Sequence, residues 1–284
     1  MGGLRLGVVA AALVVAATSL AIGAATAAGP TPGVVTGWDG IATSTGQFRF
    51  VAVTSSRDTV LQKIATRGGR VVRFASVRGF YGIPLVSWDG TATGLTRDGK
   101  SLVLSTYPAA GAFTRFAVYD SRTLKVRQRV ALRGVWSLDA LSPDGATLFL
   151  IKYLRGDDYA NYRVRAYDLR ANRLIAGSIV DKREPEAMTG SPMTRATSSD
   201  ARWAYTLYGR DADAPFIHAL DTRNRAAVCI DLPWRVSKDA LSNVRMRIGK
   251  DGLVLSQRGT GRLATVDLRT FAVSSVRAPV APGG

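Results

Sequence analysis

The sequence contains one cysteine, one histidine and two glutamates among its 284 residues, and each shortage excludes a class of structure or chemistry. Because Cys229 is alone, no disulfide can form within the chain, and the fold must be stabilised by packing. Because His218 is alone, a metal site built from two or three histidines is excluded. No Gly-x-Ser-x-Gly sequence is present, so the chain does not have the nucleophile turn of an α/β-hydrolase.

Long uncharged runs are missing too, except at the N-terminus. Arg5 is the only charged residue before Asp39, and the small residues Ala25-Thr26-Ala27 follow an apolar stretch at residues 6–22. This order is typical of a secretory signal peptide. We therefore predict a cleaved signal at residues 1–28, a lead-in at 29–37, and a protein that is secreted, extracellular or associated with the cell envelope. The alternative is an uncleaved membrane anchor, because residues 6–28 are long enough to span a bilayer.

Acidic residues are scarce relative to basic ones: 38 Lys and Arg face 21 Asp and Glu, which gives a net charge of +17. A polycation of this kind binds polyanions by releasing their counterions. The basic residues are spread along the whole chain, and aromatic residues are not interleaved with them in one place, as single-strand binders require. We therefore expect a general affinity for an anionic envelope polymer and no specific nucleic-acid site.

What the sequence does contain is one short pattern in several copies, Asp-x-Arg at the end of an apolar run. A fifth copy, Ala65-Thr66-Arg67, has lost the Asp but keeps the Arg. The five arginines are 55, 48, 53 and 46 residues apart, so one module is repeated five times. The intact copies are Asp120-Ser121-Arg122, Asp168-Leu169-Arg170, Asp221-Thr222-Arg223 and Asp267-Leu268-Arg269.

Each module also carries a polar turn about 20 to 25 residues before the Asp-x-Arg position, followed at once by a short apolar run. Asp-Gly between two apolar runs is a strong hairpin signal, because Gly accepts a positive φ and Asp caps the turn. Repeats of this length made of short strands are typical of a β-propeller. The sequence thus predicts an all-β chain, a β-propeller of four-stranded antiparallel blades over residues 38–277, with a tail at 278–284. We expect five blades; six stay possible, because residues 78–95 are loosely patterned.

One copy carries a family resemblance. Ser142-Pro143-Asp144-Gly145-Ala146-Thr147-Leu148 resembles the SPDG-type repeat of TolB-like and related WD40-like propellers, and Thr96-Arg97-Asp98-Gly99-Lys100-Ser101-Leu102 is similar. The resemblance implies the propeller fold and says little about activity, because propellers host many unrelated functions. The repeated Asp is expected to have a structural role, accepting hydrogen bonds from turn amides, and the Arg is expected to lie across the next strand.

A second recurring pairing, Trp near Asp, supplies the candidate site. The connections between blades gather on one face of a propeller, so these residues are predicted to ring a central funnel. Indole rings beside carboxylates suit sugars. The predicted ligand-binding residues are Trp38, Asp39, Trp88, Asp89, Trp136, Asp139, Trp234 and Asp239.

These observations predict a monomeric, non-catalytic binding or interaction module at the cell envelope, with no cofactor and no metal. Its expected partner is a protein, an anionic envelope polymer or a carbohydrate. The alternative is a glycoside hydrolase that uses Asp39, Asp89 and Glu186 across the funnel. His218 is expected to be an ordinary surface or inter-blade residue rather than a catalytic base. A third reading is an envelope sensor anchored by its N-terminal segment.

Overall fold

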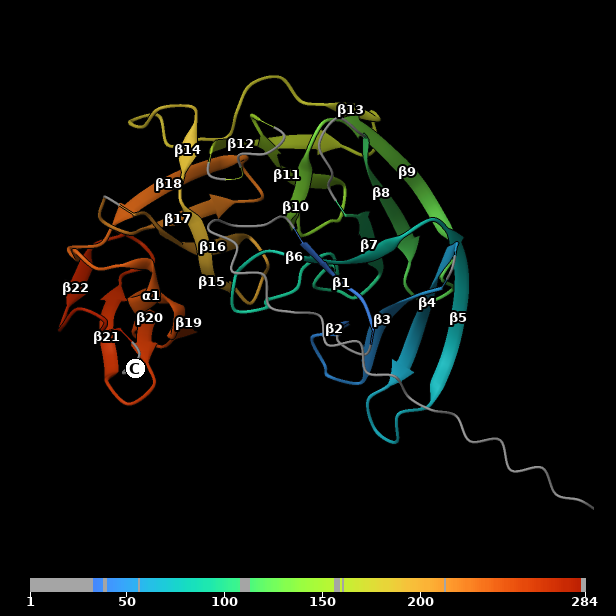
Figure 1. Ribbon diagram of the computed structural model, residues 1–284, viewed down its shortest axis with the longest axis horizontal. Helices are drawn as coiled ribbons and strands as arrows, with labels where there is room; N and C mark the ends of the chain where they lie inside the picture. Colours follow the sequence, from blue (N-terminus) through green and yellow to red (C-terminus); the bar gives the residue numbers. More distant parts are fainter. Residues whose placement is uncertain are drawn as a thin grey trace, which may run out of the picture.

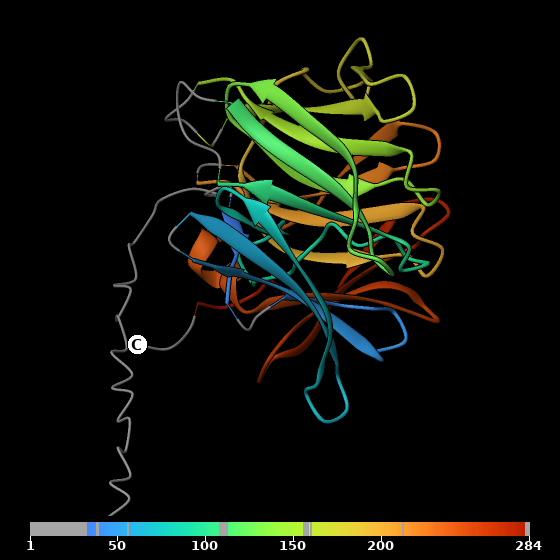
Figure 2. The ribbon, with the colours of Figure 1, turned by 90° about the vertical axis from the view of Figure 1, so that its right-hand side faces the viewer.

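The computed structural model describes residues 33–37, 40–55, 57–107, 113–155, 159, 161–211 and 213–281. Apart from one short helix, α1 (Lys238–Ser242), the regular structure of these residues is antiparallel β-sheet. Five sheets follow one another around a common centre in chain order (Figure 1). From the side, loops gather at the two ends of the strands (Figure 2). We number the sheets as blades 1 to 5.

Each blade runs from an inner strand outward. Blade 1 contains β2 (Gly40–Ala42), β3 (Phe48–Thr54), β4 (Asp58–Ala65) and β5 (Val71–Arg78). Blade 2 contains β6 (Tyr81–Leu85), β7 (Ser101–Thr106), β8 (Phe113–Asp120) and β9 (Val126–Arg133). Blade 3 contains β10 (Trp136–Leu141), β11 (Thr147–Tyr153), β12 (Asn161–Asp168) and β13 (Arg173–Leu174), with β14 (Met188–Thr189) also paired to β12.

The last two blades follow the same plan. Blade 4 contains β15 (Ser191–Thr197), β16 (Trp203–Gly209), β17 (Phe216–Asp221) and β18 (Ala226–Asp231). Blade 5 contains β19 (Val244–Gly249), β20 (Gly252–Gln257), β21 (Gly261–Val266) and β22 (Val273–Ser275). The all-β prediction is confirmed, and five sheets fit five blades. Residues 78–95, which left a sixth blade possible, contain the inner strand of blade 2 and form no sheet of their own.

Two strands depart from the plan of the other blades. The segment 29–37 was expected to be a lead-in, but its residues Gly33–Val35 form β1, which pairs with β6 as an extra inner strand of blade 2. The outer strand of blade 3 is only two residues long, because β13 ends at Leu174. Beyond it, single amide bonds from Ile175 to Ala166 and from Ile179 to Val164 replace a continuous ladder.

The core lies between consecutive blades in four separate clusters. The third strand of each blade supplies side chains to these clusters: Phe116 and Val118 pack between blades 2 and 3, and Val164 and Ala166 between blades 3 and 4. One face of the third strand therefore packs against the neighbouring blade. Apolar area removed from water in this way is the main stabilising term for a chain without disulfides.

The repeated Asp is a turn cap. In each of four blades its Oδ1 accepts hydrogen bonds from the amides two and three residues later, at 2.7 to 3.0 Å; the residues are Asp120, Asp168, Asp221 and Asp267. The predicted structural role of the Asp is therefore confirmed. The Arg of blade 3 does not lie across the next strand as expected: Arg170 instead reaches Asp144, in the SPDG turn of its own blade, at 3.0 Å.

Candidate binding surfaces

The predicted ring of tryptophans is not assembled by the residues that the structure describes. Trp38 and Asp39 lie outside the described residues. Trp136 and Trp234 are each 3 % exposed, and their indole N–H groups donate to Arg133 O and Ser275 Oγ. Of the three ring tryptophans that the structure describes, Trp88 alone is exposed, at 56 %, and presents its indole to a ligand.

The acids of the predicted ring are dispersed as well. Asp139 was expected in a connection before an inner strand; it lies within β10, where its carboxylate is buried and ion-paired with Arg195 of β15. Asp239 lies in the first turn of α1. Glu186 is exposed and 3.5 Å from Arg163. Among the described members of the predicted set, Trp136, Trp234 and Asp139 are therefore buried within the fold and are not displayed around a funnel.

Trp88 and Asp89 instead lie at the tip of a hairpin that interrupts the inner strand of blade 2. A bridge between Leu85 and Ala92 closes this axial hairpin, residues 86–91. It crosses the centre of the molecule to blade 4, because the Trp88 and Asp89 amides donate to Pro192 O at 2.8 Å and Met193 O at 3.2 Å. In the sequence, this hairpin falls within residues 78–95, where the strand pattern of the other modules is irregular.

The Asp89 carboxylate is used to hold the hairpin together. It accepts hydrogen bonds from the Ser87 and Thr91 hydroxyls, at 2.8 and 2.7 Å, and from the Thr91 amide at 3.1 Å. Burial alone would raise the pKa of this carboxyl, but the hydroxyls of Thr194, Thr91 and Ser87 hold it below its usual range. Asp89 is therefore an ionised, structurally engaged group.

Two cavities lie at opposite ends of the inner strand β10. The segment of blade 2 that carries the axial hairpin contributes residues to the lining of both cavities. The central basin, about 770 Å³, is lined by side chains from all five blades, among them Arg97, Arg195 and Arg247. The aromatic recess, about 270 Å³, is lined by Trp88, Tyr107 and Tyr153. Glycoside hydrolysis needs two carboxyl groups facing each other across one site. Among the described residues no Asp or Glu lines either cavity.

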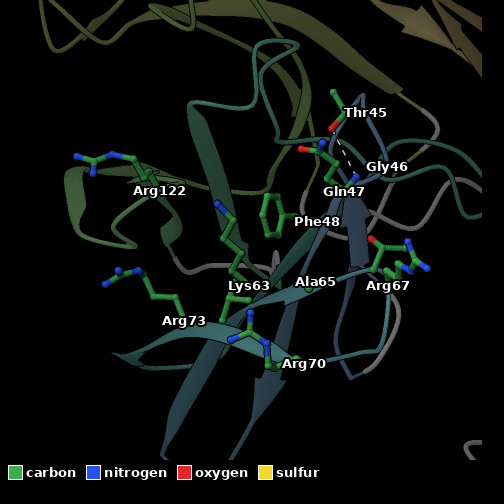
Figure 3. Close-up of a pocket in the computed structure, with 12 residues that line it drawn as sticks. Thr45, Gly46, Gln47, Phe48, Lys63, Ala65, Arg67, Arg70, Arg73 and Arg122 are labelled. Atoms are coloured by element: carbon green, nitrogen blue, oxygen red, sulfur yellow. Dashed lines mark hydrogen bonds between the residues drawn. The ribbon is translucent and has the colours of Figure 1, made fainter.

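A third cavity, of about 770 Å³, opens at the edge of blade 1 beside the turn between β8 and β9 of blade 2 (Figure 3). We call it the cationic groove. Its charged lining residues are all basic: Lys63, Arg67, Arg70, Arg73 and Arg122. Thr45, Gln47 and Thr66 add polar groups to its wall. The groove thus concentrates positive charge where no lining side chain neutralises it.

Lys63 lies at the centre of this groove (Figure 3), and its surroundings penalise its charge. Its ammonium nitrogen lies 4.2 Å from the centre of the Phe48 ring, a favourable cation–π distance. Partial burial and then the Arg73 guanidinium lower its pKa from the usual value; Asp120 opposes this and Arg122 adds to it. An anion in the groove would relieve this repulsion.

The groove coincides with the degenerate repeat. Ala65 lines it at the position of the turn-capping Asp of the other blades. The backbone register is the same, because the Ala65 amide donates to Arg70 O at 2.8 Å as the Asp120 amide donates to Lys125 O at 2.9 Å. Sequence reasoning missed this site; its signal was the lost Asp followed by Arg67-Gly68-Gly69-Arg70.

His218 lies away from all these cavities, 1 % exposed between blades 3 and 4, and neither ring nitrogen has a hydrogen-bond partner among the described residues. Burial lowers the pKa of its imidazole to about 4. Cys229 is its cross-strand neighbour in β18 and packs against the same core, and burial raises the pKa of the thiol to about 12. Cys229 therefore lies in a strand, partly buried beside the core.

No group of three or more His, Cys, Asp or Glu side chains in the described part of the chain is arranged to hold a metal ion. Within the same residues, no helix has the length and apolar character needed to cross a membrane.

Comparison with known proteins establishes the fold alone. No family model matches the chain, and no curated protein matches its sequence. The β-propeller domain of Cps50 (Swd1) from Myceliophteria thermophila is similar in structure, with a TM-score of 0.50 and 12% identity over 86% of this chain and 73% of that one. A functionally unknown protein from Desulfotomaculum acetoxidans gives a TM-score of 0.51 and 14% identity over 84% and 68%.

TolB from Acinetobacter baumannii gives a TM-score of 0.45 and 15% identity over 81% of this chain and 53% of that one. The five sheets and the likeness to the Cps50 domain confirm that the fold is the β-propeller implied by the SPDG-type resemblance.

Proposed function

We propose that this protein is an exported, non-catalytic binding module of the cell envelope, and that it holds an anionic polymer in the cationic groove. The observation that carries the proposal is the lining of that groove: five basic side chains and no carboxylate. A concave surface of one charge sign focuses the electrostatic potential and concentrates ligands of the opposite sign.

The contrast with other arginines supports this proposal. Across the described chain several arginines are neutralised within the fold: Arg127 by Asp120, Arg183 by Asp181 and Arg202 by Asp221. The five groove cations form no ion pair with any described residue. They share this with other unpaired basic side chains of the described residues, but these five line a single cavity and are therefore available together to one external anion.

Export rests on residues 1–28, which lie outside the described residues. If the signal is cleaved, the protein recovered from the envelope fraction or the medium begins near residue 29, and intact-mass measurement shows the loss. Recovery of the full 284-residue chain in the membrane fraction would favour the anchored alternative.

The binding proposal is tested by titrating a poly(glycerol phosphate) polymer into the purified protein at several salt concentrations. Because binding releases counterions, log K should fall linearly with log salt, with a slope set by the number of phosphates neutralised. The double variant Arg70→Ala/Arg73→Ala should lower both the affinity and the slope. The matched control, Arg258→Ala/Arg269→Ala, removes the same charge from exposed positions in blade 5 and should change both much less.

Equal losses in the two double variants would mean that the polymer responds to net charge alone, and the groove assignment would fail. A neutral oligosaccharide of similar length should not bind with this salt dependence.

A further inference from the structure

The strongest feature beyond general charge is the space beside Ala65. In blades 2 to 5 a carboxylate of the chain itself occupies the corresponding place and accepts two turn amides. In blade 1 a methyl group stands there, and the cavity extends to it. The equivalent amides, those of Arg67 and Gly68, donate to no acceptor among the described residues.

The groups around this space match an oxyanion. Lys63 precedes Ala65 on β4, Arg67 follows it in the turn, and Arg70 and Arg73 lie on or just before β5 (Figure 3). Arg122 reaches the groove from the Asp-x-Arg turn of blade 2. Guanidinium groups bind phosphate and carboxylate oxygens in pairs, and an ammonium binds them as a point charge.

We propose that the turn of blade 1 is a binding site for a phosphoryl group, which takes the place of the carboxylate that the repeat has lost. The inference deepens the proposed function, since it assigns the chemical class of ligand to the same groove. A phosphoryl group is favoured over a single carboxylate because five basic side chains line the groove that extends to this space. Exposed one-to-one ion pairs contribute little, so a group that offers several oxygens to several cations at once gains most from this cluster.

The test supplies the missing carboxylate within the chain. Ala65→Asp restores the residue found in the other four blades, and it should both fill the space and offset part of the positive charge of the groove. In the absence of ligand we expect the Tm of this variant to be unchanged or to rise by ~2–4 °C, which shows that it folds. Its affinity for inorganic pyrophosphate, measured by calorimetric titration, should be at least about tenfold weaker than that of the wild type.

Two controls separate the site from its surroundings. Ala171→Asp adds the same charge to the corresponding turn of blade 3, where Asp168 already caps the amides, and should leave pyrophosphate binding unchanged. Ala65→Asn fills the space without adding charge and should weaken binding less than Ala65→Asp. Equal pyrophosphate affinity in the wild type and Ala65→Asp would overturn the proposal.

The outcomes distinguish this inference from the proposed function. Polymer binding that depends on Arg70 and Arg73, together with no pyrophosphate binding to the wild type, would leave the proposed function standing and refute the phosphoryl site. Pyrophosphate binding that is lost in Ala65→Asp, without polymer binding, would support the site and refute the polymer. Citrate at matched ionic strength distinguishes the oxyanions: tighter binding of citrate than of pyrophosphate would assign the groove to carboxylates and contradict the proposal.

Discussion

Lowering the pH should destabilise this protein through a single side chain, His218. The imidazole is buried between blades 3 and 4, with Tyr208 in an edge-to-face ring contact at 6.4 Å. Desolvation is the main cause of its lowered pKa, about 4 against the usual 6.5. Three charged groups act on it in addition: Asp139 and Asp181 raise the pKa, and Arg195 lowers it.

The sign and the size of the effect follow from these values. The folded protein excludes a proton that the unfolded chain accepts, so the contribution is fully present above about pH 6.5 and is lost as the pH falls toward about 4. At ~1.4 kcal/mol for each pH unit, this interval corresponds to about 3 kcal/mol of unfolding free energy. For a domain of this size the Tm should fall by roughly 6–12 °C.

The assay is urea unfolding at several pH values between about 7 and 4.5 for the wild type and for His218→Leu. Since His218 is the only histidine, the variant should lose most of the pH dependence in this interval. The aspartates with lowered pKa values, such as Asp89 and Asp221, lose their contributions at more acidic pH, below the usual 3.8. Equal slopes for the two proteins, or a pKa near 6.5 for His218 by NMR, would refute the reasoning.

Three further predictions concern buried or capping groups. Trp136→Ala should lower the free energy of unfolding, measured in urea, by about 3–5 kcal/mol because the indole is in the core. Replacement of the exposed Trp88 by Ala should lower it by less than ~1 kcal/mol. Similar losses in the two variants would contradict the burial argument. Asp139→Ala should lower the free energy of unfolding by about 3–5 kcal/mol, because it leaves the Arg195 charge buried and unpaired. The double variant Asp139→Leu/Arg195→Met should recover much of that loss, as measured by thermal unfolding. Asp221→Ala, which removes a turn cap and the Arg202 ion pair, should cost about 2 kcal/mol by urea unfolding, and an unchanged midpoint would show that the cap is dispensable.

The fold was predictable because its signals are local and repeated. The Asp-x-Arg copies mark the turn after each third strand, and the Ser142-Pro143-Asp144-Gly145 turn forms the hydrogen bonds that its residues suggest, with Ser142 Oγ donating to Asp144 Oδ1 at 2.6 Å. Alternating apolar positions of the third strands, such as Phe116 and Val118, lie on the face that packs between blades. The pairing of β1 with β6 was not predictable, because it joins segments separated by a whole blade.

The candidate site was predicted less well, because sequence spacing does not say which loops enter the centre. Trp88-Asp89-Gly90 occupies the tip of the axial hairpin, whereas Trp136 lies inside a strand, although the two resemble each other in the sequence. The cationic groove was hidden by the even spread of arginines along the chain. Only folding brings Arg122 of blade 2 to the basic residues of blade 1.

The most direct test of the central claim is a crystal structure of the protein soaked in tungstate, a tetrahedral dianion that is located by its anomalous scattering. The account predicts a tungstate beside the Ala65 methyl group, within hydrogen-bond distance of Lys63 Nζ or of the guanidinium groups of Arg70 and Arg73, and no such peak in Ala65→Asp. Tungstate bound only in the central basin, at Arg97 or Arg247, or the same peak in both proteins, would contradict it.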